Sequence, residues 1–280
     1  MNYDRKSAIV TGGATGIGRA LAVSLAKAGC KVAIADIDLD NAQSAVEEIK
    51  TLGGDAVAYQ CDVANLDRVA EVFSKAFEDF GVIEFAFINA GVTQLAKLEN
   101  LKALDLEWMF RVNVFGAWQC AKCFIEETRK AGTTGAHLVF TGSENSLSIP
   151  PHSRKVGAGG YNMTKHAMLS MAETLRYELD NDDIAVSLAL PGGVQTEILF
   201  SVQKRQDEFG GAGTPVIATA EDLQLGGDET PTILSPDRAA DLILQGVADN
   251  QFFISTHPQV LQDFLNRAAE IEAAFSAASF

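Results

Sequence analysis

The 280-residue sequence predicts an α/β fold: a single domain, residues 1–280, built on a doubly wound parallel sheet of about seven strands with helices on both faces. Two observations predict it. Short apolar runs alternate with longer segments of helical period along most of the chain, an order typical of parallel strands joined by crossover helices. Hydrophobic residues make up 47% of the chain, which is enough for one large core.

Each element is expected where its period is clearest. Apolar runs bounded by turn residues predict strands at 7–10, 31–35, 56–61, 84–88, 136–141, 184–190 and 252–255. Helical periods predict helices at 19–28, 40–52, 65–80, 104–130, 161–180 and 236–248, with a terminal helix after Pro258. Residues from about 194 to 235 contain several glycines and little sustained period, so we predict a substrate lid there with one or two short helices.

A glycine-rich turn joins the first strand to the first helix. Gly12, Gly16 and Gly18 lie in this turn, just before Arg19. Glycines let a backbone approach a pyrophosphate, and a helix N-terminus supplies free N–H groups and a positive dipole end. We therefore interpret the turn as a phosphate-binding site. The spacing differs from the common G-x-G-x-x-G pattern, and a plain tight turn is the alternative.

Acidic residues follow the next two strands. A carboxylate at the position of Asp36 accepts hydrogen bonds from the ribose hydroxyls of NAD and repels the extra phosphate of NADP. No arginine follows it, since Ile37 is next. The alternative is that Asp36 caps the following helix, but Asp38 or Asp40 could do so instead. Asp62 follows the third strand, where it could meet the adenine edge.

A tyrosine and a lysine lie one helical turn apart in the stretch predicted to be a helix from 161 to 180. Tyr161 and Lys165 share a face if the stretch is helical. A neighbouring ammonium lowers a phenol's pKa from its usual ~10 by roughly 1–3 units. Such a phenol could exchange a proton with an alcohol or ketone near neutral pH. Taken alone, the pair also fits a solvated helix face.

Composition argues against several classes of protein. The formal net charge of −15 argues against a nucleic-acid surface. No uncharged apolar run approaches the ~18 residues of a membrane span, and no signal-peptide pattern opens the chain, so we expect a cytoplasmic protein. The four cysteines and four histidines show no metal-ligand spacing, although Cys120 and Cys123 form a C-x-x-C pair. We expect reduced thiols and no metal site.

These residues together carry a family resemblance. The chain resembles the short-chain dehydrogenases/reductases over nearly its whole length. The matching pieces are Thr11-Gly12-x-x-x-Gly16-x-Gly18, Asp36, Asp62-Val63, Asn89-Ala90-Gly91, Asn113, Ser143, Tyr161-x-x-x-Lys165 and Pro191-Gly192-x-Val194-x-Thr196. Each piece is weak alone, but all of them in order make a specific signal. The resemblance implies a Rossmann-like fold and an NAD-dependent oxidoreductase.

The resemblance also implies a role for each residue. Tyr161 is expected to be the general acid/base, Lys165 to hold the nicotinamide ribose and depress the tyrosine pKa, and Ser143 to hydrogen-bond the substrate oxygen. Asn113 is expected to hold a water in a proton relay from Lys165, and Thr196 to bind the nicotinamide carboxamide. The full set of implied cofactor contacts is Thr11, Gly12, Thr15, Gly16, Ile17, Gly18, Asp36, Asp62, Val63, Asn89, Ala90, Gly91, Tyr161, Lys165, Pro191, Gly192, Val194 and Thr196.

The sequence departs from the family pattern in two places. Ile88 replaces the first of two asparagines that commonly precede Ala-Gly. The segment between Ser143 and Tyr161 is longer than usual, with the extra residues within 146–160. That insertion leaves Ser146 and Ser148 as alternatives to Ser143, which is preferred because it follows its strand directly.

The substrate is expected to be a secondary alcohol or ketone with a hydrophobic or aromatic body, because the lid contains Ile198, Leu199 and Phe200. Gln94, Leu95, Glu144, Asn145 and Gly193 are further residues expected to line the pocket. Two alternatives stay open at this point. One is a non-catalytic NAD-binding sensor or scaffold, and the other is an epimerase or dehydratase of the same superfamily.

The helices predicted at 104–130 and 161–180 carry apolar residues on more than one side. Because exposing both stripes would leave a large apolar patch in water, we expect a homo-oligomer, either a dimer or, as we favour, a tetramer. The family resemblance implies the same assembly. We expect the terminal helix and Phe280 near a second interface.

Overall fold

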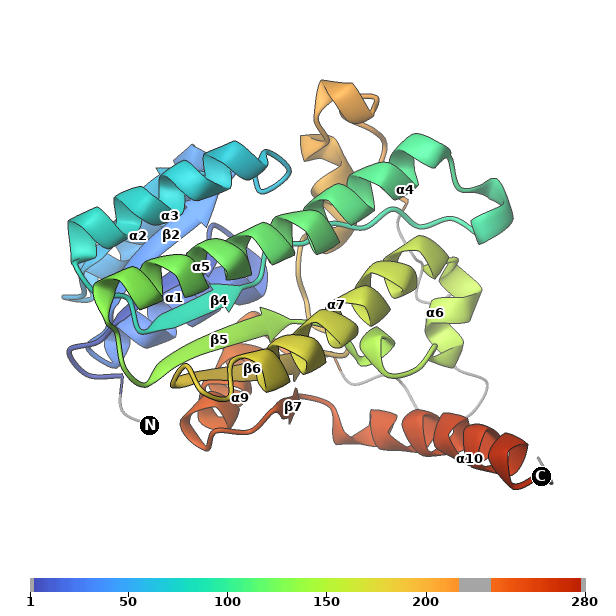
Figure 1. Cartoon of the computed structure of the whole chain (residues 1–280). Helices are drawn as coiled ribbons and strands as arrows, with labels where there is room; N and C mark the ends of the chain where they lie inside the picture. Colours follow the sequence, from blue (N-terminus) through green and yellow to red (C-terminus); the bar gives the residue numbers. More distant parts are fainter. Residues whose placement is uncertain (1–2, 217–232, 278–280) are drawn as a thin grey trace.

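The computed structural model describes residues 3–216 and 233–277, and its centre is a seven-stranded sheet (Figure 1). The strands are β1 (Ser7–Thr11), β2 (Lys31–Asp36), β3 (Ala56–Gln60), β4 (Phe85–Ile88), β5 (Ala136–Thr141), β6 (Ile184–Leu190) and β7 (Phe253–Ser255). Every neighbouring pair is parallel, in the order β3-β2-β1-β4-β5-β6-β7. The predicted doubly wound sheet is confirmed. Its order reverses between β1 and β4, which is where ligands bind in such sheets.

Helices cover both faces of the sheet. They are α1 (Gly16–Lys27), α2 (Leu39–Thr51), α3 (Leu66–Phe80), α4 (Ala103–Phe110), α5 (Ala117–Ala131), α6 (Pro151–Val156), α7 (Gly159–Glu178), α9 (Pro236–Ala248) and α10 (Leu261–Ala277). Helices α1, α2 and α9 share one core cluster with the sheet, and α3, α4, α5 and α7 share the other. This burial on both faces explains why β1, β4 and β5 read as continuous apolar runs instead of alternating ones.

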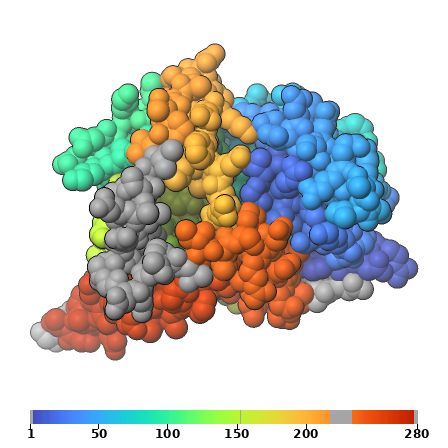
Figure 2. Space-filling view, turned by 180° about the vertical axis from the view of Figure 1, so that it is seen from behind, coloured from blue at the N-terminus to red at the C-terminus, as the bar shows by residue number. Residues whose placement is uncertain are grey.

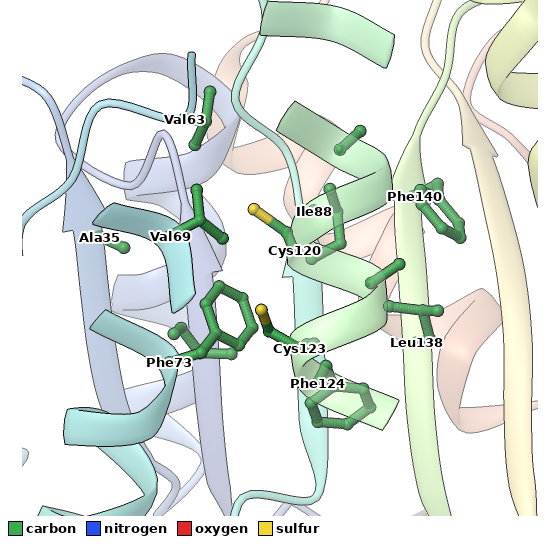
Figure 3. Packing of buried hydrophobic residues seen from close by; sticks show 14 of the residues in the cluster. Ala35, Val63, Val69, Phe73, Ile88, Cys120, Cys123, Phe124, Leu138 and Phe140 are labelled. Carbon is green, nitrogen blue, oxygen red and sulfur yellow. The ribbon is translucent and has the colours of Figure 1, made fainter. Parts of the chain in front are cut away.

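The core between α3 and α5 also contains the C-x-x-C pair. Figure 3 shows Phe73 of α3 facing Cys120 and Cys123 of α5, with Ile88 and Leu138 of the sheet nearby. Both cysteines are buried and free, and burial raises the pKa of each thiol. The pair therefore packs as small apolar side chains in this core.

The predicted helix at 104–130 is divided by a π-helical turn. Between α4 and α5 lies η2 (Arg111–Gly116), a π-helix that contains Asn113. Gly116 brings this turn against the loop after β3, since a Cβ added there would lie 2.6 Å from the carbonyl oxygen of Val63. A π turn is often found at a functional site, and it leaves no trace in the hydrophobic period.

Two further segments differ from the sequence prediction in detail. The 146–160 insertion forms α6, a short helix that we did not predict. The described part of the predicted lid contains two 3₁₀ helices, η4 (Ile198–Lys204) and η5 (Asp207–Phe209). Figure 2 shows this part of the predicted lid, in amber, beside the N-terminal part of the chain, in blue. The rest of the predicted lid, 217–232, and Phe280 lie outside the described residues.

The last described helix lies along the edge of the molecule. None of the residues of α10 is buried, and it extends past β7 toward the C-terminus (Figure 1). Among residues 3–216 and 233–277, the structure has no helix with the length and apolar character that a membrane crossing requires.

Candidate active site

An open cleft of about 310 Å³ lies at the carboxyl ends of the strands. It collects most of the predicted site residues: Gly12, Thr15, Gly16, Ile17, Asp36, Asp62, Val63, Asn89, Ala90, Gly91, Ser143, Tyr161, Lys165, Pro191, Gly192, Val194 and Thr196. Three predicted residues, Thr11, Gly18 and Asn113, are not part of its lining. They pack against or hydrogen-bond to the segments that line it. The convergence follows from topology, because the carboxyl ends of parallel strands meet at one edge of a sheet.

The glycine-rich turn packs closely on the turn after β4. Gly12 and Gly16 have φ angles of +63° and +55°, which favour glycine. A Cβ on Gly18 would lie 2.1 Å from the carbonyl oxygen of Gly12, so no side chain fits there. The Thr11 hydroxyl accepts hydrogen bonds from the amides of Asn89 and Ala90 at 3.0 and 3.2 Å. Thr11 and Gly18 therefore shape the cleft without lining it.

Asp36 lies at the end of β2, on the wall of the cleft. Its carboxylate accepts hydrogen bonds from the backbone amides of Ala14 and Asp38, each at 3.0 Å. Burial raises the pKa of Asp36, and the two amides lower it. The helix-capping role belongs to Asp38, whose side chain accepts from the amide of Asn41 at 3.1 Å. Capping therefore does not account for Asp36.

The segment predicted to be a lid lines part of the cleft and contributes residues that the sequence did not indicate. Gln206 donates to both carboxylate oxygens of Asp62 at 2.8 Å and accepts from the indole of Trp108 at 3.0 Å. Lys204 forms an ion pair of 2.8 Å with Asp38. All these residues except Asp38 line the cleft. No motif signals them, because their partners lie far away in the sequence.

Tyr161 and Lys165 share a face of α7, as their spacing predicts. The Lys165 ammonium lies 5.4 Å from the centroid of the Tyr161 ring and donates to the carbonyl oxygen of Thr141 at 2.7 Å. Burial lowers the pKa of Lys165 to about 7. Burial also raises the pKa of Tyr161 above its usual value, a hydrogen bond with Ser143 lowers it, and Glu144 raises it.

The expected lowering of the Tyr161 pKa by Lys165 is therefore not found. The sequence predicted that the ammonium would lower the Tyr161 pKa, but this pKa is raised, and burial is the largest cause. Burial also disfavours the ammonium itself. The predicted placement holds, because the two side chains lie side by side in the cleft.

Of the three candidate serines, only Ser143 lines the cleft. Its hydroxyl accepts from the amide of Asn145 at 3.2 Å and donates to the carbonyl oxygen of Pro191 at 3.4 Å. The Ser146 hydroxyl accepts from the backbone amide of Ser143 at 3.2 Å, so Ser146 supports the turn.

The expected pocket residues fit less well. Ile198 and Phe200 line the cleft, but Gln94, Leu95, Glu144, Asn145 and Gly193 do not belong to the lining. Glu144 and Asn145 are buried behind Ser143. A strand end indicates the direction of its last residue, and the tight turn η3 (Glu144–Ser146) then directs the next two away from the cleft.

Asn113 is fully buried in the π turn. Its side chain accepts from the amide of Val92 at 2.8 Å and donates to the Val92 carbonyl oxygen at 2.9 Å. It also donates to the Thr164 hydroxyl at 3.0 Å. Asn113 thus joins the turn after β4 to α7, next to Lys165. A polar side chain buried in an apolar segment requires such partners.

A family model described as short chain dehydrogenase matches residues 6–207. The chain belongs to the short-chain dehydrogenase/reductase family. It is an oxidoreductase of that family, whose members bind a nicotinamide cofactor. The resemblance inferred from the motifs is confirmed.

Individual relatives show the same family and a varied cofactor. A 1-deoxy-11-beta-hydroxypentalenate dehydrogenase of Streptomyces avermitilis is 30% identical over 92% of this chain and 86% of its own. A short-chain dehydrogenase/reductase of Burkholderia phymatum, solved in complex with NAD, is 31% identical, with a TM-score of 0.86 over 98% of this chain and 96% of its own. One from Burkholderia cenocepacia, solved with NADP, is 24% identical, with a TM-score of 0.72 over 91% and 97% of the two chains.

Proposed function

We propose that this short-chain dehydrogenase/reductase transfers a hydride between NAD(H) and a secondary alcohol or ketone with a hydrophobic or aromatic body. One observation carries the proposal. The cleft is lined both by the phenol of Tyr161, with Ser143, and by the buried carboxylate of Asp36. A dinucleotide-dependent hydride transfer needs a group that exchanges a proton and a group that holds the adenosine ribose.

The residues present fit a dinucleotide. The first helix has no side-chain cap at Thr15, so its N-terminal amides are available to a pyrophosphate, and Thr15, Gly16 and Ile17 line the cleft. We assign Asp36 to the adenosine ribose, Asp62 and Val63 to the adenine end, and Lys165 with Asn89–Gly91 to the nicotinamide ribose. Pro191, Gly192, Val194 and Thr196 would hold the nicotinamide. The bound cofactor supplies the hydride donor or acceptor.

Tyr161 is the proposed general acid/base. It takes the hydroxyl proton when an alcohol is oxidised and returns it to the oxygen when a ketone is reduced. Ser143 would orient that oxygen, because it lines the same cleft as the phenol. Lys165 would hold the ribose. Asn113 fixes the segment beside Lys165 through which a proton relay would pass.

The proposed preference for NAD over NADP rests on the negative charge of Asp36 on the wall of the cleft. Asp36 is buried and presents a carboxylate where a 2′-phosphate would lie, and its neighbour Ile37 offers no positive charge. A phosphate there would meet like charge in a poorly solvated place. Lys204 approaches the same region, but its ammonium is paired with Asp38.

The substrate class rests on the apolar part of the cleft. It is lined by Val92, Val112, Ile198 and Phe200 together with Tyr161. An apolar body would bury surface against these side chains while its oxygen meets Ser143 and Tyr161. The S. avermitilis relative is named for a hydroxy compound, which supports an alcohol as one reactant.

A substrate screen tests the proposal directly. Purified protein is mixed with NAD and a panel of secondary alcohols that vary in apolar bulk, and NADH absorbance is followed. We expect turnover with bulky apolar alcohols and little with short or charged ones. A protein that binds NAD but oxidises no alcohol and reduces no ketone in the panel would contradict the function.

We further propose a homo-oligomer. Phe115 and Trp118 near the start of α5 are 50% and 45% exposed, and Met163 of α7 and Leu104 of α4 are exposed as well. An exposed surface with several large apolar side chains is usually covered by another surface. A second copy of the chain would cover it by two-fold symmetry without a further partner.

The cytoplasmic location stays a prediction from the sequence.

A further inference from the structure

Three buried polar side chains behind the candidate catalytic residues form a closed ring of hydrogen bonds. Asn145 donates through its amide nitrogen to the Ser153 hydroxyl at 3.0 Å and to the Asn162 side-chain oxygen at 2.7 Å. Ser153 donates to the same Asn162 oxygen at 3.0 Å. The exposed fractions are 6% for Asn145, 2% for Ser153 and 5% for Asn162, so water does not compete for these bonds.

The three members come from three different segments. Asn145 lies in η3, two residues after Ser143, and Asn162 lies in α7, directly after Tyr161. Ser153 lies in α6, within the insertion that makes the Ser143–Tyr161 segment longer than usual. The ring thus joins the serine turn and the tyrosine helix through a side chain that the insertion supplies.

The connection to Ser143 is direct. The backbone amide of Asn145 donates to the Ser143 hydroxyl at 3.2 Å, and Ser143 lines the cleft together with Tyr161. If the side chain of Asn145 moves, the amide that directs this hydroxyl moves with it. A fully satisfied buried network is stiff, because each member loses its partner if it shifts.

The insertion is itself fixed at its other end. The amide of Ala96 donates to the Gly157 carbonyl oxygen at 2.8 Å, and Ala96 pairs with Ala158 in a parallel bridge. Gly157 has a φ of +72°, and a Cβ there would lie 2.7 Å from the carbonyl carbon of Ala96. The close approach requires glycine. Ser153 is therefore carried by a segment anchored to the loop after β4.

We propose that Ser153 is a positioning residue, and that the insertion serves to hold Ser143 and Tyr161 at their working separation. The inference rests on the proposed function of these two residues. Their separation must be kept closely, since a misplacement of about 1 Å can cost about a hundredfold in rate. Ser153 itself lies outside the cleft lining.

The test compares variants that remove or keep the hydroxyl. Ser153→Ala opens the ring and should lower kcat by about tenfold to a hundredfold, while the KM for NAD changes by less than about twofold. Ser153→Thr keeps the hydroxyl and should recover most of kcat. Ser187→Ala is the matched control, because Ser187 is a fully buried serine hydrogen-bonded to His137 and Gln251, away from the cleft. It should lower Tm but leave kcat unchanged.

A second readout does not depend on activity. Amide hydrogen exchange at Asn145 and Asn162 should be at least about tenfold faster in Ser153→Ala than in the wild type, and unchanged in Ser187→Ala. Wild-type protein without any turnover would refute the proposed function, and the exchange rates would still decide whether the ring holds the two segments. If the wild type is active, an unchanged kcat in Ser153→Ala would overturn the inference. Whether or not the wild type is active, unchanged amide exchange at Asn145 and Asn162 in Ser153→Ala would also overturn it.

Discussion

The ammonium of Lys165 donates a 2.7 Å hydrogen bond to the carbonyl oxygen of Thr141, the last residue of β5. Lys165 is only 2% exposed, and it forms no salt bridge with a carboxylate among the described residues. Burial lowers its pKa to about 7. A charge held in this way costs stability, so its place in the cleft points to function.

Replacing Lys165 with methionine should stabilise the fold and abolish turnover. The folded pKa lies below the unfolded value of about 10.4, so the unfolded chain binds more protons between pH 7 and 10. The wild-type free energy of unfolding therefore rises with pH across this window. At pH 7 we expect Lys165→Met to be about 1–3 kcal/mol more stable, after allowance for the lost hydrogen bond. Urea unfolding at pH 7 and 9 measures this, and a gain that does not shrink at pH 9 would disprove the burial cost.

The pH dependence of alcohol oxidation should follow the phenol. Burial raises the pKa of Tyr161, so only a small fraction is ionised at neutral pH. Because oxidation needs the phenolate, kcat/KM for the alcohol should rise between pH 7 and 9 by up to about tenfold per unit. Glu144→Gln removes a charge that raises this pKa and should move the profile to lower pH. An oxidation rate that falls as pH rises from 7 to 9 would rule out Tyr161 as the base.

Cofactor preference should depend on Asp36. Asp36→Ala combined with Ile37→Arg removes the carboxylate and adds a phosphate-binding charge. Hydrogen bonds to a charged group contribute about 1.5–3 kcal/mol, so NAD affinity should fall roughly tenfold to a hundredfold while NADP affinity rises. Asp40→Ala removes the same charge from an exposed position in α2 and serves as the control. Cofactor titrations measure both affinities, and tighter NADP than NAD binding by the wild type would contradict the role of Asp36.

Light scattering tests the assembly. One chain has a mass of 29.9 kDa. At micromolar concentration we expect the mass of a dimer or, as we favour, of a tetramer. Trp118→Glu places a charge among the exposed apolar residues near the start of α5 and should reduce the mass. Leu52→Glu, at an exposed position beyond α2 on the other face of the sheet, should leave it unchanged. A wild-type mass of one chain would refute the oligomer.

The sequence was sufficient to predict the sheet and the residues at its carboxyl edge. Each strand is a short apolar run, and parallel strands bring residues such as Asp36 and Ser143 to one place whatever their separation in the chain. The π turn around Asn113 could not be predicted, since it changes one turn of a helix without changing its apolar pattern. The lid contacts of Gln206 and the ring around Ser153 depend on distant partners. The pKa of Tyr161 depends on burial that no motif records.

The central claim is that Tyr161 carries the proton in hydride transfer, and Tyr161→Phe tests it most directly. The change keeps the ring against Lys165 and removes only the hydroxyl. The measurement is the steady-state rate with NAD and the best alcohol from the screen, beside the NAD affinity of the same preparation. We predict a kcat about 10²–10⁴-fold below wild type with NAD affinity within about threefold. Turnover at the wild-type rate in Tyr161→Phe would contradict the mechanism.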